Sequence, residues 1–174
     1  MRTILFLRHA QAVLPDSTGK DFDRSLSKAG RSDAEKQAER ILKAGIKPDF
    51  ILCSPAKRTL QTAEIFSAAI NGVFPEDTIA PHAAASLYRA GATGYIHEIR
   101  TQVPATAQCA LIVGHNPSIE DCTLLFALSN SQFAQRVGYG FPTAGLARIE
   151  TDGLFSEFSP ENAQLTALYL PHED

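Results

Sequence analysis

Short apolar runs alternate with amphipathic stretches along the chain. Residues 3–7, 50–53 and 109–113 are continuous apolar runs with the length of buried β-strands. The stretches between them repeat apolar residues at intervals of three and four, which is typical of helices with one buried face. Strands that are apolar on both faces and alternate with helices predict an α/β fold with a mainly parallel sheet.

Helix boundaries are indicated by capping residues. The first helix begins after Ser27, a favourable N-cap, and ends before Gly45, which suits a C-cap. A second helix follows Pro55. The predicted helices lie between Ser27 and Gly45, between Pro55 and Ile70, at residues 93–103 and between Ser118 and Leu128.

The remaining segments predict loops and edge strands. Residues 71–82 contain two prolines and a glycine and predict a loop around one short strand. Residues 145–150 and 164–170 predict two antiparallel edge strands, with a turn near residues 152–153. The chain has neither an internal repeat nor a low-complexity tract, and its 174 residues fit one domain spanning residues 1–174.

Composition narrows the classes of partner. The net charge is -3, so we expect no general attraction to nucleic acid, and an anion site has to be local. No apolar run approaches the roughly 18 residues of a membrane span. The first apolar run, residues 4–7, is too short for the core of a signal peptide.

Cys53, Cys109 and Cys122 form no C-x-x-C pair, and we expect reduced core cysteines in a cytoplasmic protein.

Three predicted strands end in polar residues. Arg8 and His9 follow the first strand, Arg58 lies four residues after Ser54 at the second, and His115-Asn116 follows the third. Ligands of open α/β sheets bind outside the carboxyl ends of the strands. Two arginines and two histidines at one crevice favour a dianion, and phosphate is the obvious candidate.

Each of these residues alone is a weak signal, since a single arginine or histidine after a strand is usually a surface residue. The conjunction at three strand ends is what favours an anion site. His9 and His115 could also bind zinc, but the neighbouring arginines would repel a cation. We therefore expect neither a metal nor a cofactor.

The three motifs, read together, resemble those of a known family. LRHA at 7–10, SPxxRTxxTA at 54–63 and GHN at 114–116 resemble the histidine phosphatase (phosphoglycerate mutase-like) superfamily. The short chain, the DRSLSxxG stretch at 23–30 and PTAGLA at 142–147 are similar to its small phosphohistidine phosphatase, or SixA-like, branch. The resemblance implies a three-layer α/β/α sandwich with a mainly parallel central sheet and an antiparallel edge.

The resemblance also implies roles for individual residues. His9 matches the nucleophile that becomes phosphorylated, with Arg8 and Arg58 as phosphate-binding arginines. His115 matches the second histidine at the phosphoryl group, and Asn116 lies next to it in the motif as a phosphate-binding candidate. Arg24 matches an arginine that the small branch places at the pocket; the less favoured alternative is a surface charge at a helix entry.

The chemistry of these side chains suits that reaction. Phosphoryl transfer needs positioning and stabilisation of charge spread over the phosphoryl oxygens, which fixed guanidinium groups provide. A nucleophilic imidazole has to be neutral, and the nearby arginines, Arg8 above all, disfavour its protonated form. Water then hydrolyses the phosphohistidine in a second step, without a metal.

One departure from the family pattern bears on the substrate. Many members carry a glutamate as general acid where this chain has Ser86. An alkoxide leaving group needs such an acid, whereas an imidazole, with a pKa near 6.5, needs little help. The sequence also leaves little room for a lid between Thr62 and Gly114, and an open pocket admits a protein side chain. These features favour a phosphorylated protein carrying phosphohistidine as the substrate.

Two alternatives stay open. The first is a small-molecule phosphomonoesterase that uses Glu98, or an aspartate of the loop between Arg8 and Asp23, as its acid; a mutase is less favoured because acid and lid are both missing. The second is a phosphate-binding module without turnover. The carboxylates that the sequence cannot place in the pocket are Asp16, Asp21, Asp23, Glu98 and Glu120.

Overall fold

A six-stranded sheet organises the chain. The computed structural model describes residues 1–15, 17, 19–127 and 131–173. The strand order is β3-β2-β4-β1-β5-β6, with β3, β2, β4 and β1 parallel and β5 and β6 antiparallel. The strands are β1 (Arg2–Arg8), β2 (Phe50–Cys53), β3 (Pro81–Ala83), β4 (Cys109–Gly114), β5 (Leu146–Thr151) and β6 (Ala163–Tyr169). The mainly parallel sheet with an antiparallel edge is thereby confirmed.

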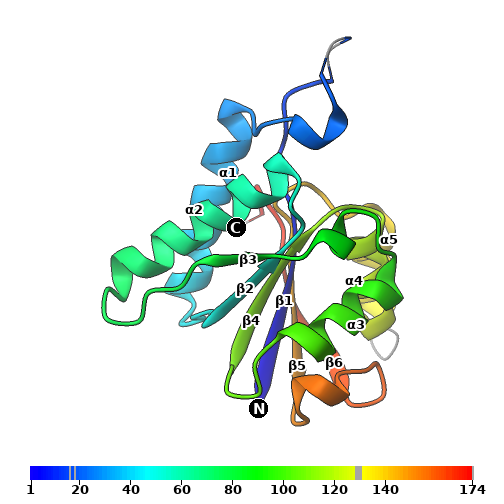
Figure 1. Ribbon diagram of the computed structural model, residues 1–174. Coiled ribbons are helices and arrows are strands. Elements are labelled where there is room, and N and C mark those ends of the chain that lie inside the picture. Colours follow the sequence, from blue (N-terminus) through cyan, green and yellow to red (C-terminus); the bar gives the residue numbers. More distant parts are fainter. Residues whose placement is uncertain (16, 18, 128–130, 174) are drawn as a thin grey trace.

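Helices cover both faces of this sheet. Figure 1 shows α1 and α2 on one side and α3, α4 and α5 on the other. The α-helices are α1 (Lys28–Lys43), α2 (Lys57–Val73), α3 (Ala92–Gln102), α4 (Ser118–Ala127) and α5 (Ser131–Gly138); the short 3₁₀ helices are η1 (Asp21–Asp23), η2 (Ala85–Tyr88) and η3 (Phe155–Glu157). This arrangement is the expected three-layer α/β/α sandwich.

The apolar strands are explained by burial on both faces. Along β1, Ile4 and Phe6 belong to the core beneath α3 and α4, whereas Leu5 and Leu7 belong to the core beneath α1 and α2. All four side chains have no exposed surface. Alternate residues of one strand therefore fill two separate cores, which is why the run shows no polar alternation.

The predicted caps of α1 are confirmed. The Ser27 hydroxyl accepts a hydrogen bond from the Gly30 amide at 3.0 Å, as an N-cap does. Gly45 follows the helix with a φ of +74°, a conformation that glycine adopts without steric cost. Its amide donates to the Leu42 carbonyl and closes the last turn.

Three details differ from the sequence prediction. The helix α2 continues to Val73, past its predicted end at Ile70. The Asn71 side chain exchanges hydrogen bonds with the backbone of Ile79, so the turn after the helix begins later in the chain. The helix α5 was not predicted, since eight residues give too short a pattern. Instead of a tight turn, β5 and β6 are joined by a longer segment containing η3, anchored by the buried Phe155. The predicted helix end at Leu128 lies outside the described residues.

The three cysteines are core residues, as expected. Cys53, Cys109 and Cys122 are buried and free. Burial raises the pKa of Cys53 and Cys109 to about 12, and it raises that of Cys122 as well. Their thiols are therefore poor nucleophiles.

The parallel strands finish side by side. Arg8 pairs with Gly114, and Cys53 pairs with Val113, so the ends of β1, β4 and β2 are immediate neighbours. In Figure 1 this is the upper end of the sheet, opposite the N-terminus. Among the described residues, no helix has both the length and the hydropathy of a membrane span.

Candidate active site

The backbone around His9 is held from both sides. Arg8 ends β1, and the His9 amide donates to the Gly114 carbonyl of β4 at 2.9 Å. On the opposite side, the Ala144 amide donates to the carbonyls of Arg8 and His9 at 3.1 and 3.2 Å. Hydrogen bonds from the PTAGLA motif therefore hold the loop that carries His9, the predicted nucleophile, in place.

The first turns of α2 connect the second motif to this loop. The Thr59 hydroxyl donates to the Ser54 carbonyl at 2.8 Å and shapes the turn before the helix. The Thr62 hydroxyl donates to the Arg58 carbonyl and accepts from the Ala10 amide at 3.1 Å. Both threonines are fully buried. Their role is to fix Arg58 relative to the segment after His9, and the sequence prediction missed it.

His115 is placed by the end of β4 and by α3. Its amide donates to the Tyr95 hydroxyl at 3.3 Å. Gly114 is required here, because a Cβ at this position would lie 2.2 Å from that hydroxyl oxygen. The His115 Nε2 lies 2.8 Å from the Ser54 hydroxyl. Ser54 is a further site residue that the sequence prediction had not assigned.

Arg58 lies between the two histidines. Its Nε donates to His9 Nε2 at 3.3 Å, and its Nη2 donates to His115 Nδ1 at 3.2 Å. The two imidazole rings are 5.4 Å apart between centroids. Arg58 is 7% exposed and His115 is 9% exposed. The expected convergence of the second and third strand ends on His9 is therefore observed.

The hydrogen bonds indicate the tautomer of each histidine. His9 Nδ1 lies 2.7 Å from the Ala10 carbonyl, which can only accept, so the ring proton is on Nδ1. His9 Nε2 then keeps its lone pair and faces the Arg58 donor. For His115, the Arg58 donor at Nδ1 places the proton on Nε2, which donates to Ser54.

Both imidazoles are held neutral. Burial, together with the smaller effects of the charges of Arg58, His115 and Arg8, lowers the pKa of His9 to about 3, while the Ala10 carbonyl opposes this shift. Burial, followed by the charge of Arg58, lowers the pKa of His115 to about 4. The sequence had attributed neutrality to the arginines alone, but loss of solvent is the larger cause.

Arg8 reaches the site from β1. Its Nη1 donates to the Phe141 carbonyl at 2.7 Å, and its buried Nε has no hydrogen-bond partner among the described residues. Burial lowers the pKa of Arg8, and the Glu120 carboxylate opposes that shift. The Phe141 carbonyl also accepts from Asn116, so the Arg8 guanidinium lies near the residue that follows His115. The charge of Arg8 lowers the pKa of both histidines.

Asn116 is tied into the wall of the site. Its Nδ2 donates to Glu120 Oε2 at 3.0 Å and to the Phe141 carbonyl at 3.2 Å. Glu120 Oε2 also accepts from the Phe141 amide at 2.9 Å. Both amide donors of Asn116 are therefore used within the wall. Its predicted contact with phosphate stays a prediction.

Asp21, which the sequence could not place, lies directly on Arg58. Arg58 Nη1 donates to the Asp21 carbonyl at 2.7 Å, and Nη2 donates to the Asp21 carboxylate at 3.0 Å. The same carboxylate accepts from Arg24 Nη1 at 3.0 Å and from the Tyr88 hydroxyl at 3.2 Å. Arg24 is thus connected to the site through Asp21, and its predicted contact with phosphate stays untested.

The charge state of Asp21 follows from these contacts. Partial burial raises the pKa of Asp21, but the hydrogen bond from Arg24 and the charge of Arg58 outweigh it, and the pKa lies below its usual value. Asp21 is therefore a carboxylate at neutral pH. The only sequence signal for it is its position three residues before Arg24, which does not indicate a contact with Arg58.

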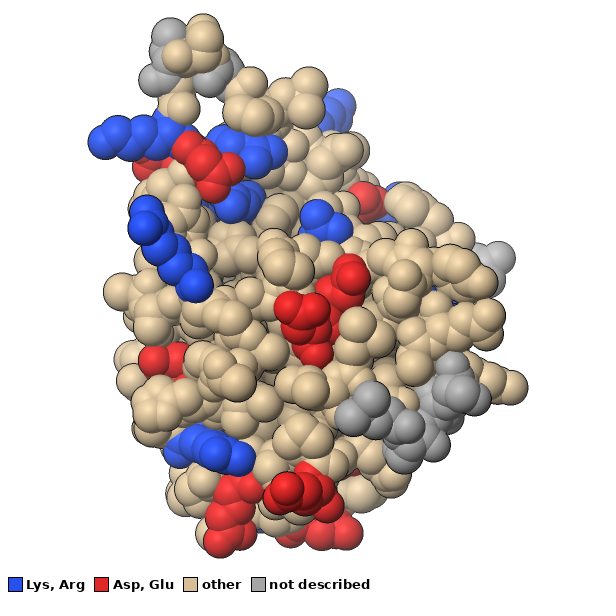
Figure 2. All heavy atoms as spheres, turned by 90° about the vertical axis from the view of Figure 1, so that its right-hand side faces the viewer, with Lys and Arg blue, Asp and Glu red and all other residues tan. Residues whose placement is uncertain are grey.

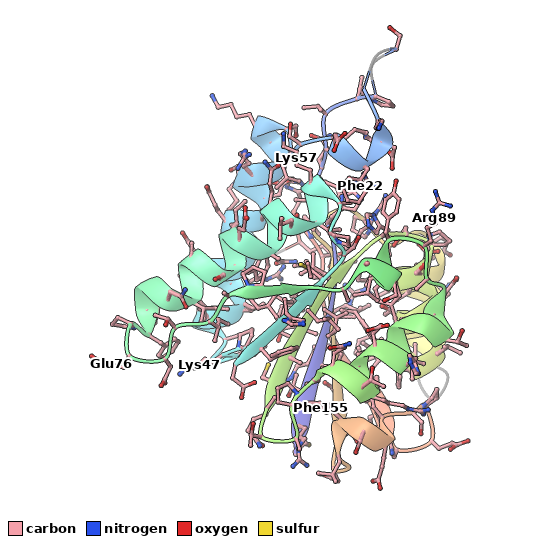
Figure 3. The ribbon with its side chains drawn as sticks, in the orientation of Figure 1. Phe22, Lys47, Lys57, Glu76, Arg89 and Phe155 are labelled. Atoms are coloured by element: carbon pink, nitrogen blue, oxygen red, sulfur yellow. The ribbon has the colours of Figure 1, made fainter. Side chains whose placement is uncertain are left out.

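Two aromatic residues extend from His115 toward η1. The Tyr88 ring meets the His115 ring edge-on at 5.7 Å, and Phe22 meets Tyr88 at 5.0 Å. Figure 3 places Phe22, Lys57 and Arg89 around the upper end of the sheet. On the face covered by α3–α5, most Lys and Arg side chains lie toward this upper end and most Asp and Glu side chains lie lower (Figure 2). At the site, the guanidinium groups of Arg8, Arg24 and Arg58 outnumber the carboxyl groups of Asp21 and Glu120, although the chain as a whole is acidic.

The position expected for a general acid is occupied by a serine that contacts a carboxyl group. The Ser86 hydroxyl donates to Glu98 Oε1 at 2.7 Å. Within the described part of the chain, neither Ser86 nor Glu98 has a hydrogen bond to His9, Arg8, Arg58 or His115. The described residues also contain no group of three or more His, Cys, Asp or Glu suited to a metal ion.

Comparisons with known proteins show the family of this chain. Residues 4–79 match the family model of the histidine phosphatase superfamily (branch 1). An uncharacterised protein of Mycobacterium tuberculosis is 31% identical over 169 residues, covering 95% of this chain and 99% of the relative.

Solved structures extend the likeness to the whole chain. A protein of Agrobacterium tumefaciens assigned as the phosphohistidine phosphatase SixA has a TM-score of 0.80 at 29% identity, covering 98% of both chains. A second protein with that assignment, from Nakamurella multipartitia, has a TM-score of 0.79 at 25% identity and covers 99% of this chain and 97% of its own. This chain therefore belongs to the histidine phosphatase superfamily and to its SixA-like branch.

Proposed function

We propose that this chain is a phosphatase that forms a covalent phosphohistidine on His9 and acts on protein phosphohistidine. The observation that carries the proposal is the orientation of the His9 ring. Its Nδ1 donates to the Ala10 carbonyl at 2.7 Å, so Nε2 carries the lone pair; Nε2 accepts from Arg58 Nε at 3.3 Å, and this bond breaks when Nε2 attacks phosphorus. A neutral imidazole with a fixed tautomer is the nucleophile that this reaction requires.

The first step transfers the phosphoryl group to His9. The bond between phosphorus and the leaving nitrogen breaks while a bond forms to His9 Nε2. The substrate ring, protonated on its other nitrogen, leaves as a neutral imidazole, and the His9 ring, which keeps its Nδ1 proton, carries the positive charge in the intermediate. The guanidinium groups of Arg8 and Arg58 stabilise the phosphoryl oxygens during the transfer. His115 lies beside the reacting group, with its ring 5.4 Å from that of His9, and it positions Arg58 by accepting from its Nη2.

The second step returns His9 to its starting state. Water attacks phosphorus, the bond to His9 Nε2 breaks, and inorganic phosphate leaves. Only protein side chains are assigned to either step, so we expect no requirement for a metal. Treatment with EDTA should leave the activity unchanged; a loss that zinc or magnesium restores would contradict this assignment.

The carboxyl groups near the crevice favour phosphohistidine over an alkyl phosphate. Asp21 is ionised and bound to two arginines, so it is a poor proton donor. Glu120 Oε2 already accepts two N–H bonds in the wall. An alkoxide leaving group would receive little help from either, whereas an imidazole needs little.

A small-molecule phosphomonoesterase is the second candidate, because one observation favours it. Glu98 hydrogen-bonds Ser86, so a carboxyl group stands beside the position where the family places its acid. The substitution Glu98→Gln separates the two candidates. Under the phosphohistidine proposal, it should change turnover of phosphoramidate and of a sugar phosphate by less than ~3-fold, whereas loss of an essential acid would cost the sugar phosphate ~100-fold or more.

A direct comparison of substrates tests the leading proposal. Turnover of a phosphohistidine-bearing protein or of phosphoramidate should exceed turnover of sugar phosphates by at least ~10-fold in kcat/KM. A preference for sugar phosphates would contradict it and favour the phosphomonoesterase. An absence of turnover on every substrate, with phosphate still bound, would instead indicate a binding module.

A further inference from the structure

Asp21 has an unusual position for a site that binds phosphate. A phosphoryl group is a dianion, and it needs the N–H donors of the arginines around it. Asp21 is also an anion, and it is bound to Arg58 and Arg24 at 3.0 Å each. The residue therefore presents to these arginines the same chemistry that a phosphoryl group would present.

Counting donors shows how fully Arg58 is engaged. A guanidinium has five N–H groups. In the structure, Nε donates to His9, Nη1 donates to the Asp21 carbonyl, and Nη2 donates both to His115 and to the Asp21 carboxylate. A phosphoryl group that binds Arg58 through two nitrogens must therefore exchange with at least one of these acceptors.

Among those acceptors the carboxylate is the one that a dianion can replace most readily. The Asp21 side chain is 53% exposed, while that of Arg58 is 8% exposed. Asp21 lies on the three-residue helix η1, and this helix contains no buried residue. The carboxylate can thus move into solvent at low cost, whereas Arg58 is fixed by its backbone contacts with Thr62 and by both histidines.

We propose that Asp21 is an internal competitor for phosphate, which weakens the binding of phosphoryl groups at Arg58 and so assists the release of inorganic phosphate. The proposal rests on the phosphate site of the proposed function and goes beyond it in assigning a role to Asp21. An incoming phosphoryl group replaces the carboxylate on Nη2 of Arg58. After hydrolysis, the carboxylate returns and displaces the product.

Asp23 provides a matched control. It lies on the same 3₁₀ helix and carries the same charge, but it is exposed and has no side-chain hydrogen bond or ion pair among the described residues. Any effect of total charge on phosphate binding would appear equally in Asp21→Asn and Asp23→Asn. An effect of direct competition would appear only in Asp21→Asn, because the amide that it introduces is uncharged and has a single acceptor atom.

Direct titration with orthovanadate and with inorganic phosphate tests the proposal without relying on turnover. Asp21→Asn should bind both anions ~5-fold more tightly than the wild type, and Asp23→Asn should bind them as the wild type does. The gain should shrink as salt is raised, because half-exposed charges are screened. Asp21→Ala, with its circular dichroism compared with that of the wild type, should show the same gain.

Three results would overturn the proposal. Unchanged affinity in Asp21→Asn would show that the carboxylate does not compete, and weaker affinity would show that it orients Arg58 for phosphate instead. An equal gain in Asp23→Asn would reduce the effect to overall charge. Turnover of phosphoramidate, measured separately on the wild type, decides the proposed function. A wild type that turns over while Asp21→Asn gains no affinity therefore rejects only the competitor role.

Discussion

The site consists of an inner part and an outer part that are built differently. The inner part comprises Arg8, His9, Arg58 and His115, which stand on the ends of β1 and β4 and on the first turn of α2. The outer part comprises Asp21, Arg24, Phe22 and Tyr88, which stand on or beside the 3₁₀ helices η1 and η2.

Burial is greater in the inner part, where Arg58 and His115 are buried and Arg8 and His9 are half-buried, whereas Asp21 and Phe22 of the outer part are exposed. The Arg58 side chain is 8% exposed, whereas those of Arg24 and Asp21 are 24% and 53% exposed. Loss of solvent strengthens electrostatic interactions and holds the two imidazoles neutral, so the inner part is suited to chemistry. The outer part stays solvated and can exchange partners. We infer that the inner part sets the rate and the outer part adjusts binding.

The largest expected effect concerns the nucleophile in the inner part. His9→Ala should lower kcat/KM by about 10³-fold or more, because no other group provides the covalent path. The fold should survive, since the loop is held by backbone bonds to Gly114 and Ala144. His9→Asn is a second variant that can keep the bond to the Ala10 carbonyl. Substantial activity in either variant would reject the covalent mechanism.

Replacing arginines by lysine compares the two parts directly. Arg58→Lys and Arg8→Lys should each lower kcat/KM by ~100-fold, because an ammonium group cannot replace the planar fork. Arg24→Lys should cost less than ~10-fold, because its partner Asp21 is half-exposed and the pair is screened. Steady-state kinetics on one substrate would decide the matter. Equal losses at all three positions would remove the distinction between inner and outer arginines.

Acid stability provides a test of the buried imidazoles. Their pKa values, about 3 for His9 and about 4 for His115, lie below the value near 6.5 of an unfolded chain. Between these values the unfolded state binds more protons, so the free energy of unfolding falls as pH drops from about 6.5 toward 4. Between pH 7 and pH 4.5 we expect a loss of about 2–3 kcal/mol for each histidine.

Urea unfolding at pH 7 and pH 4.5 measures this loss. The His9→Asn variant should lose less stability than the wild type over the same interval, because one of the two neutral imidazoles is gone. Asp21 should add nothing to the difference in this range, since a carboxylate with a lowered pKa contributes stability that is lost only as the pH falls below about 4. Identical losses in both proteins would mean that His9 is not held neutral by burial.

The smallest expected effect concerns the acid that the family pattern lacks here. Ser86→Glu should raise kcat/KM for alkyl phosphates by ~10-fold and leave p-nitrophenyl phosphate and phosphoramidate unchanged, because only an alkoxide needs a proton. The neighbouring Glu98 assists, since a second carboxylate raises the pKa of the first. A uniform change on all three substrates would show that position 86 does not face the leaving group.

The sequence predicted the inner part of the site more completely than the outer part. The ends of buried strands are visible as breaks in apolar runs, so Arg8, His9 and His115 were found together with the parallel sheet that joins them. Asp21 could not be found, because a three-residue helix has no periodicity and its contact with Arg58 spans 37 positions. The hydroxyl contacts of Ser54 and Thr62 depend on tertiary packing in the same way.

From the sequence we predicted correctly that the pKa of His9 is lowered, but the neighbouring arginines explain only part of the shift. Neighbouring arginines can be read from the motif, whereas burial depends on the surrounding elements. The structure shows why His9 is buried: the crevice lies between the strand ends, α2 and the segment around Ala144. The physical reason for a neutral nucleophile therefore became visible only with the fold.

Trapping the covalent intermediate tests the central claim most directly. The protein would be mixed with phosphoramidate, quenched in alkali within milliseconds and digested, and the phosphorylated residue located by mass spectrometry, with His9→Asn and His115→Asn as controls. The account predicts an acid-labile phosphoryl group on Nε2 of His9, absent from His9→Asn and formed more slowly in His115→Asn. Phosphate on His115, or continued turnover without any phosphohistidine, would contradict it.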